Sequence, residues 1–224
     1  MKPRVIILPE TTKDPISLIG RRAGVCYGAN IDDPEKNYKR GLECIKTNHG
    51  RTLEFPKVEM VLKDFSAKAI REWYTHIAGG PTRLQASTRY IEYGDFSYVI
   101  PDTISENNKR ARIYDSCMTT ISESVKTLEE LGVPKEDASM LLPLGMTTVE
   151  VDSRNLRNLI DMSRQRLCSR AFWEYREIMR QVMEGLRNYS EEWKTVVDMT
   201  FMPKCEALGY CPEKFSCGRK PKRD

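Results

Sequence analysis

The segment KVEMVLKDF, residues 57–65, alternates polar and apolar residues, with its valine, methionine and leucine on one side. Successive side chains of a strand point to opposite faces, so this alternation predicts a strand with one buried face. Ser66 follows directly, and a Ser before an apolar run predicts a helix N-cap; we expect this helix to reach Ile77. The chain must therefore combine a sheet with helices packed on it.

Periodicity and turn residues give the other expected elements. We expect strands at 5–8 and 96–100, and a short extended piece at 147–151. Helices are expected at 15–26, 34–45, 105–131, 135–142 and, almost without interruption, 155–186. In the first of these, Ile16, Ile19, Ala23 and Cys26 would form the apolar face. Because helix exceeds strand and helices separate the strands, the sequence predicts an α+β or α/β class. One domain is expected at 1–202, with a Cys-containing tail at 203–224.

Composition excludes several classes of function. A net charge of +4 gives no strong general attraction to nucleic acid. No apolar run approaches the ~20 residues that cross a bilayer, so no membrane span is expected. The seven cysteines are odd in number and scattered, which favours reduced thiols and a cytoplasmic location over a disulfide framework.

A Gly-Gly-Pro turn precedes Ser87, Thr88 and Arg89. Two hydroxyls, successive backbone N–H groups and a guanidinium suit a phosphate, which binds several convergent donors and a fixed charge. A turn at a strand entry, with Arg89 paired to a carboxylate, explains the same residues. Spacing alone does not separate the two interpretations.

A second basic cluster lies in 155–178. On a continuous helix, Arg166, Arg170 and Glu174 would share one face because they are four residues apart. Such a face is typical of a surface helix with ion pairs. The alternative is that several arginines turn inward and bind an anionic ligand.

At this point the sequence resembles the flavin-dependent thymidylate synthases, over most of residues 3–200. The resemblance is carried by short segments in the family's order and at its separations. They are His49-Gly-Arg-Thr-Leu-Glu54, Gln85-Ala-Ser-Thr-Arg-Tyr90, Leu142-Pro143, Asn155-x-Arg157-x-Leu159 with Arg166, and Ala171-Phe-Trp-Glu174.

The sequence departs from the family pattern at two places. The family's signature begins with Arg-His-Arg, and counting back from Ser87 puts Ile77, Ala78 and Gly79 in those positions. His76 takes the place of the signature His only if this loop is slightly longer than usual. Ser139 stands where the family usually has an Arg for the nucleotide phosphate. Both departures concern ligand contacts rather than the fold.

The resemblance implies an α+β fold with a small antiparallel sheet and long packed helices. It implies conversion of dUMP to dTMP, with methylenetetrahydrofolate as carbon donor, reduced FAD as hydride donor and NADPH as reductant of the flavin. It further implies a homotetramer with active sites between subunits. Modification of another pyrimidine nucleotide, or nucleotide binding without catalysis, stays open as an alternative.

The resemblance also assigns roles to residues. Arg166 would stabilise charge on the pyrimidine as the catalytic residue. The nucleotide would bind to Gln85, Ser87, Thr88, Arg89 and Arg166. The flavin would contact His49, Arg51, His76, Asn155, Arg157 and Asp161. Ser87 is interpreted as a binding residue because a Ser without a neighbouring base is a poor nucleophile.

The tail places Cys205, Cys211 and Cys217 six residues apart. Zinc sites usually begin with two Cys separated by two to four residues, and three thiols leave a fourth ligand unexplained. We therefore expect no metal and a tail that packs its thiols as small apolar groups, with the three cysteines as the alternative metal ligands.

Overall fold

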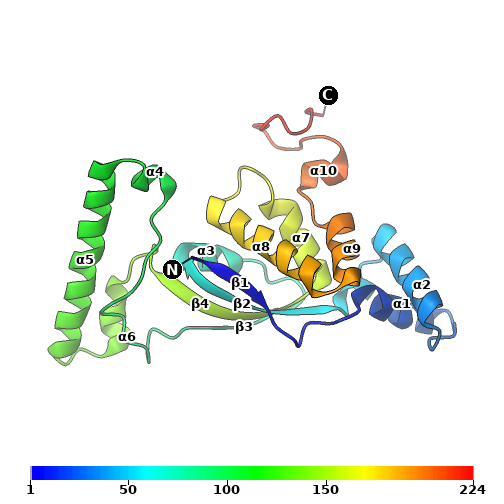
Figure 1. Cartoon of the computed structure of the whole chain (residues 1–224), viewed down its shortest axis with the longest axis horizontal. Coiled ribbons are helices and arrows are strands. Elements are labelled where there is room, and N and C mark those ends of the chain that lie inside the picture. The colour runs from blue at the N-terminus through cyan, green and yellow to red at the C-terminus, as the bar shows by residue number, and fades with distance from the viewer. Residues whose placement is uncertain (1, 224) are drawn as a thin grey trace.

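A computed structural model describes residues 2–223. Its centre is an antiparallel sheet of β1 (Arg4–Ile7), β2 (Lys57–Ser66), β4 (Thr147–Asn155) and β3 (Thr82–Gln85), in this spatial order. Figure 1 shows helices stacked along the sheet and a helical arm beyond it. The α+β class with a small antiparallel sheet is therefore confirmed.

The core lies between the sheet and the helices above it. Val58, Met60 and Leu62 of β2 are fully buried, as the alternation predicted. They belong to one cluster with apolar residues of α7 (Leu156–Arg166), α8 (Trp173–Tyr189) and α9 (Glu191–Thr200). Ser66 caps α3 (Ala67–Trp73) by accepting a hydrogen bond from Ala69 N, so the predicted N-cap is confirmed. The helix ends at Trp73, before the expected Ile77.

Helices α1 (Pro15–Cys26) and α2 (Pro34–Lys46) form a closely packed hairpin. A Cβ at Gly20 would lie 1.7 Å from the carbonyl oxygen of Asn37, so only glycine permits this approach. The glycines that weaken helix propensity here are thus packing residues. Ile16, Ile19 and Ala23 are buried as expected, whereas Cys26 is exposed.

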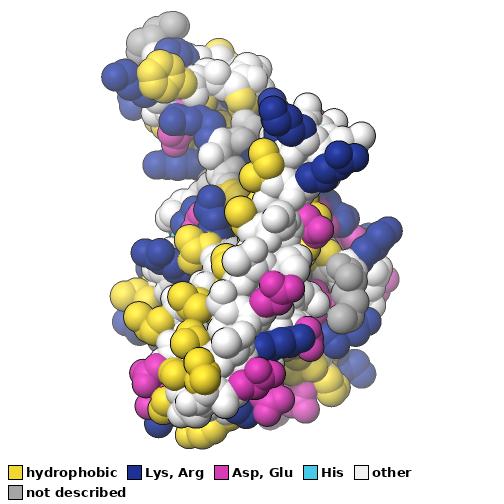
Figure 2. Space-filling model, turned by 90° about the vertical axis from the view of Figure 1, so that its left-hand side faces the viewer, with side chains coloured by type: hydrophobic (Ala, Val, Ile, Leu, Met, Phe, Trp, Pro, Cys, Tyr) yellow, Lys and Arg dark blue, Asp and Glu magenta, His cyan; other side chains and the backbone are white. Residues whose placement is uncertain are grey.

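The expected helix 105–131 is interrupted near its start. A short α4 (Asp102–Ser105) precedes α5 (Asn108–Glu130), because Asn107 accepts hydrogen bonds from Lys109 N and Arg110 N and caps the second helix. Helix α6 (Lys135–Ala138) and a 3-10 turn (Ser139–Leu141) follow. Figure 2 looks onto this arm and shows exposed apolar side chains among charged ones. Among them are Ile113, Leu131 and Met140.

The loop before the arm also differs from the expectation. Residues 96–100 form no strand and pair only through an isolated bridge between Tyr98 and Met146. The strand lies earlier, at β3, because Thr82–Gln85 pair with residues 150–153 of β4. The predicted extended piece at 147–151 is the first half of the longer β4.

The expected helix 155–186 is two helices, α7 and α8, separated by a turn at 167–172. Arg170 lies in this turn and pairs with Glu213 at 3.0 Å. Glu174 accepts a hydrogen bond from Ser66 N at 2.7 Å. The common helical face of Arg166, Arg170 and Glu174 therefore does not exist.

Helix α10 (Lys204–Leu208) begins the tail. An isolated β-bridge between the backbones of Cys211 and Lys222 closes the segment after α10 into a loop. Across residues 2–223 no helix has the length and apolar character that a membrane span requires.

Candidate functional site

Arg166, the last residue of α7, is held by groups from three directions. Its Nε donates to His76 Nε2 at 3.0 Å, and its NH1 group pairs with Glu72 Oε2 of α3 at 3.1 Å. Its guanidinium carbon lies 4.7 Å from the centre of the Tyr175 ring of α8. A guanidinium fixed in this way is pre-organised to stabilise negative charge on a ligand.

His76 is a neutral imidazole in this arrangement. Burial, together with the neighbouring cations of Arg166 and Arg154, lowers the pKa of His76 from 6.5 to about 4. Because Nε2 accepts the hydrogen bond from Arg166, the remaining proton belongs on Nδ1. His76 thus positions the arginine and adds no charge.

A buried polar network lies beneath Arg166. Arg154 NH2 pairs with Asp152 Oδ2 at 2.8 Å, and both side chains are inaccessible to solvent. The same carboxylate oxygen accepts from Trp73 Nε1 at 2.7 Å. Arg154 NH1 donates to the carbonyl oxygen of His76 and to Asn158 Oδ1, both at 2.8 Å. The network therefore fixes the turn that carries His76.

The sequence patterns do not predict this network. The signal was present, because Glu150, Asp152 and Arg154 occupy every second position of an extended segment. Charged residues on one strand face usually indicate solvent, and here that face is buried.

Glu150 is buried beside the ion pair, and neither of its carboxylate oxygens has a hydrogen-bond partner among the described residues. Burial, and then the nearby charge of Asp152, raise the pKa of Glu150 from 4.5 to about 9. It is therefore a neutral acid at physiological pH.

Replacing Glu150 by Gln is expected to flatten the pH dependence of stability. The folded protein keeps the Glu150 proton up to a pKa of about 9, whereas the unfolded chain releases it above 4.5. Stability therefore falls as pH rises through this window, by up to ~1.4 kcal/mol per pH unit for one proton. Glu150→Gln cannot ionise and should lose less Tm across the window than the wild type. The exposed Glu130→Gln variant is the control, and parallel Tm curves for wild type and Glu150→Gln would contradict the assignment.

Several predicted flavin residues lie near one another. Asn155 caps α7 by accepting from Asn158 N, and its Nδ2 donates to the carbonyl oxygen of Gly79 at 3.4 Å. Arg157 pairs with Glu54 at 2.7 Å, and Arg51 pairs with the same carboxylate at 3.3 Å. His49 is exposed in the adjoining turn.

A cavity of about 610 Å³ lies beside these residues. His76 and Asp161 line it together, with Arg164 and Lys204 as basic neighbours. Two cations suit the pyrophosphate of a dinucleotide. The residues present therefore fit a flavin cofactor.

The predicted phosphate residues follow the end of β3, whereas Gly79, which Asn155 contacts, lies before its start. Gln85 Nε2 donates to Thr148 Oγ1 at 3.3 Å, and Ser87 Oγ accepts from Arg89 N at 3.1 Å. Thr88 is exposed in the same turn. Arg89 pairs with Glu136 of the arm at 2.9 Å. An ion pair of Arg89 with a carboxylate is what we expect if this segment is a turn without a ligand. Neither Arg89 nor Glu136 contacts Arg166 through a described hydrogen bond or ion pair.

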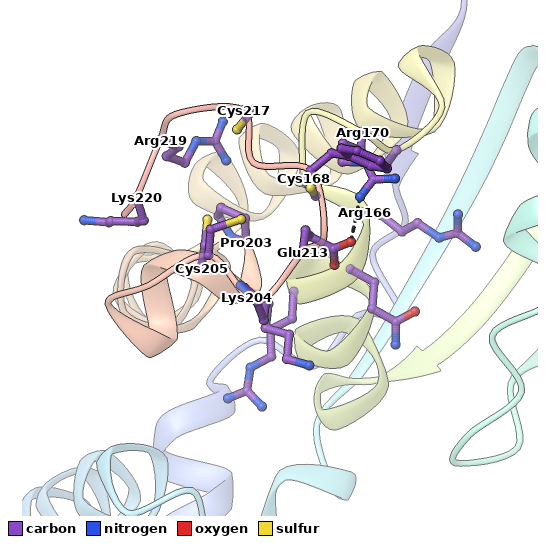
Figure 3. A pocket seen from close by; sticks show the side chains of 16 residues that line it. Arg166, Cys168, Arg170, Pro203, Lys204, Cys205, Glu213, Cys217, Arg219 and Lys220 are labelled. Carbon is purple, nitrogen blue, oxygen red and sulfur yellow. Dashed lines mark hydrogen bonds and ion pairs between the residues drawn. The ribbon is translucent and has the colours of Figure 1, made fainter. Parts of the chain in front are cut away.

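The tail cysteines line a second cavity, together with Arg166 (Figure 3). No group of three His, Cys, Asp or Glu side chains within residues 2–223 is arranged to hold a single metal ion.

Known proteins match this chain over most of its length. Residues 7–189 match the family model described as thymidylate synthase complementing protein. The flavin-dependent thymidylate synthase of Nitratidesulfovibrio vulgaris is 27% identical, over 99% of this chain and 97% of the relative. The enzyme of the same name from Pyrococcus furiosus is 31% identical, over 93% of this chain and 89% of the relative.

Solved structures share the fold. A UMP/dUMP methylase, PolB from Streptomyces cacaoi bound with 5-Br dUMP, has a TM-score of 0.72 at 15% identity, covering 89% of this chain and 96% of its own. The flavin-dependent thymidylate synthase ThyX from Helicobacter pylori, complexed with FAD and dUMP, has a TM-score of 0.66 at 16% identity, covering 86% and 99%. The matches over nearly the whole length of the chain show that it belongs to the flavin-dependent thymidylate synthase family.

Proposed function

We propose that the protein converts dUMP to dTMP, with methylenetetrahydrofolate as carbon donor and NADPH as reductant of bound FAD. Family membership supports the reaction, since relatives along nearly the whole chain carry the name flavin-dependent thymidylate synthase. The observation that carries it here is the guanidinium of Arg166, fixed between His76 and Glu72.

Arg166 would act on the pyrimidine ring of the nucleotide. Its Nε and NH1 groups are engaged, whereas its NH2 group donates to no acceptor within residues 2–223. This NH2 group can therefore donate to the O2 or N3 edge of uracil. A fixed cation at that edge would stabilise enolate-like negative charge in the polarised ring, and this polarisation is what makes C5 able to form the bond to the incoming carbon. His76 stays neutral throughout and keeps the guanidinium in place.

The flavin would lie against the His76–Asp161 cavity, with contacts from Asn155, Arg157, Arg51 and His49. When bound, reduced FAD supplies the hydride that completes the methyl group. The polar side chains of Asn155 and Asp161 would orient the ring, and Arg164 and Lys204 would bind the pyrophosphate.

The nucleotide phosphate would bind to Ser87, Thr88 and Arg89, with Gln85 beside the nucleoside. The ion pair of Arg89 with Glu136 is exposed on both sides, and such pairs contribute only ~0–1 kcal/mol. A phosphate can therefore displace Glu136 at small cost.

A homotetramer would bring this loop to Arg166 of a neighbouring subunit. Exposed apolar side chains on and around the arm, among them Leu84, Tyr90, Met140 and Leu144, support an assembly that covers them. We also propose a cytoplasmic location, supported by seven free thiols, and a division of the chain into a domain at 1–202 and a tail at 203–224.

The purified protein is expected to be yellow, and NADPH under anaerobic conditions should bleach its flavin bands. Addition of methylenetetrahydrofolate and dUMP tritiated at C5 should release tritium to water. A colourless protein that binds dUMP without turnover would instead indicate a nucleotide-binding homologue. Turnover of UMP or dCMP but not dUMP would show that another pyrimidine nucleotide is the substrate.

A further inference from the structure

Four of the seven cysteines line one cavity of about 510 Å³. Cys168 comes from the turn between α7 and α8, Cys205 from α10, and Cys211 and Cys217 from the tail. In Figure 3, Cys168, Cys205 and Cys217 surround the same space from different segments. The fourth thiol that the tail lacks is thus supplied by the turn after Arg166. We propose that these four cysteines bind an iron–sulfur cluster.

The backbone of the tail holds these thiols near Cys168. Cys211 N donates to the carbonyl oxygen of Pro221 at 2.7 Å, which closes the tail into a loop. Two contacts join this loop to the turn beside Cys168. Arg219 donates to the carbonyl oxygen of Leu167 at 3.3 Å, and Glu213 pairs with Arg170 at 3.0 Å.

Charge around the cavity favours a ligand set of thiolates. The cavity is lined by Arg164, Arg166, Arg170, Lys204, Arg219 and Lys220, with Glu213 as the acid among its lining residues. Arg219, which the flavin proposal does not use, forms no ion pair with any carboxylate described in 2–223. Apolar packing of the tail would not gather cations here. Deprotonated thiols ligating a cluster carry a net negative charge, which these cations complement.

The lining of one cavity by four thiols, with no three of the described ligand side chains arranged around one ion, favours a cluster over a single ion. Zinc holds each sulfur at about 2.3 Å, so its thiolates must nearly touch, and no three described ligand side chains are disposed for one ion. A [4Fe–4S] cluster instead binds each thiolate at a separate iron, so its ligands stand farther apart around a larger volume. The cysteines lining a shared cavity fit this arrangement.

The test is the iron and acid-labile sulfide content of the full chain, purified anaerobically and again after reconstitution with ferrous iron and sulfide. We expect about four of each per chain and an electron paramagnetic resonance signal after dithionite reduction. Because flavin absorbs in the same region, absorbance alone is not a sufficient readout. Absence of iron after reconstitution, or one zinc per chain in its place, would overturn the proposal.

Variants locate the cluster. Cys217 is exposed, so Cys217→Ser should leave the fold intact while reducing bound iron several-fold. Cys168→Ser should do the same, which tests the ligand outside the tail. Cys117→Ser, exposed on α5, is the matched control and should keep wild-type iron. Equal iron in all three variants would contradict this ligand set. Flavin content and dUMP binding, measured on the same samples, keep this result separate from the proposed reaction.

Discussion

Replacing Arg166 by Ala is expected to lower kcat for dUMP methylation by about 10²–10³-fold, as for loss of one pre-organised donor to a developing negative charge. The side chain is partly buried and points at no structural acceptor other than His76 and Glu72 among the described residues. The fold should therefore survive its removal. Tritium release from C5-labelled dUMP measures the loss, and far-ultraviolet circular dichroism checks the fold.

Two further variants test whether geometry or charge is responsible. Arg166→Lys keeps a cation but loses the planar fork that reaches His76 and Glu72 together, so it should recover little of the activity. Arg180→Ala is the matched control, because Arg180 lies on the exposed face of α8 and its ion pairs within residues 2–223 are with Glu177 and Glu184. Wild-type turnover in Arg166→Ala would refute the role of Arg166.

Local signals predicted the elements whose structure is decided locally. The alternation of 57–65 and the cap at Ser66 were sufficient because burial of one strand face and one side-chain hydrogen bond determine them. The helix 34–45 was predicted for the same reason, with Asp33 accepting from Lys36 N at its start.

Elements decided by distant contacts were not predicted. Helical periodicity continues through 167–172, yet the chain turns there because Glu174 binds the backbone and hydroxyl of Ser66, far away in sequence. Likewise, β3 shows no alternation of its own and is a strand because β4 pairs with it. The periodicity of a segment does not predict its hydrogen-bond or strand partners elsewhere in the chain.

For the candidate site, the sequence motifs predicted Arg166 and the residues after β4. They did not predict the side chains that fix these residues in position. The resemblance predicts His76 as a flavin contact and a counterpart of the signature His, whereas the structure shows that it also accepts a hydrogen bond from Arg166 and positions it. The buried ion pair of Asp152 and Arg154 is not predicted, because charged residues at alternate positions usually indicate a strand face exposed to solvent. Only the packing of α3 and α7 against β4 shows that this face is buried.

Replacing Arg154 by Met is expected to lower the free energy of unfolding by about 3–5 kcal/mol, the cost of leaving a buried charge without its partner. Asp152 would keep its hydrogen bond from Trp73 Nε1 but lose the cation at 2.8 Å. The contact of the Arg154 guanidinium with the Trp73 ring, at 4.6 Å, would be lost as well. Urea unfolding at pH 7 measures the change.

The double variant Asp152→Asn and Arg154→Met should recover part of this stability, because no uncompensated charge stays buried. Lys126→Ala removes an exposed ion pair with Asp95 and should change stability far less than Arg154→Met does. A loss in Arg154→Met as small as in this control would contradict the buried pair.

Arg154→Met should also lower activity through Arg166, the proposed catalytic residue, although no described hydrogen bond joins the two side chains. Arg154 NH1 donates to the carbonyl oxygen of His76, whose Nε2 accepts from Arg166. At a temperature where Arg154→Met is fully folded, turnover should still fall, because the turn that carries His76 is no longer fixed. Arg154 would then act as a positioning residue, and the double variant, which recovers part of the stability but not this hydrogen bond, should remain slow.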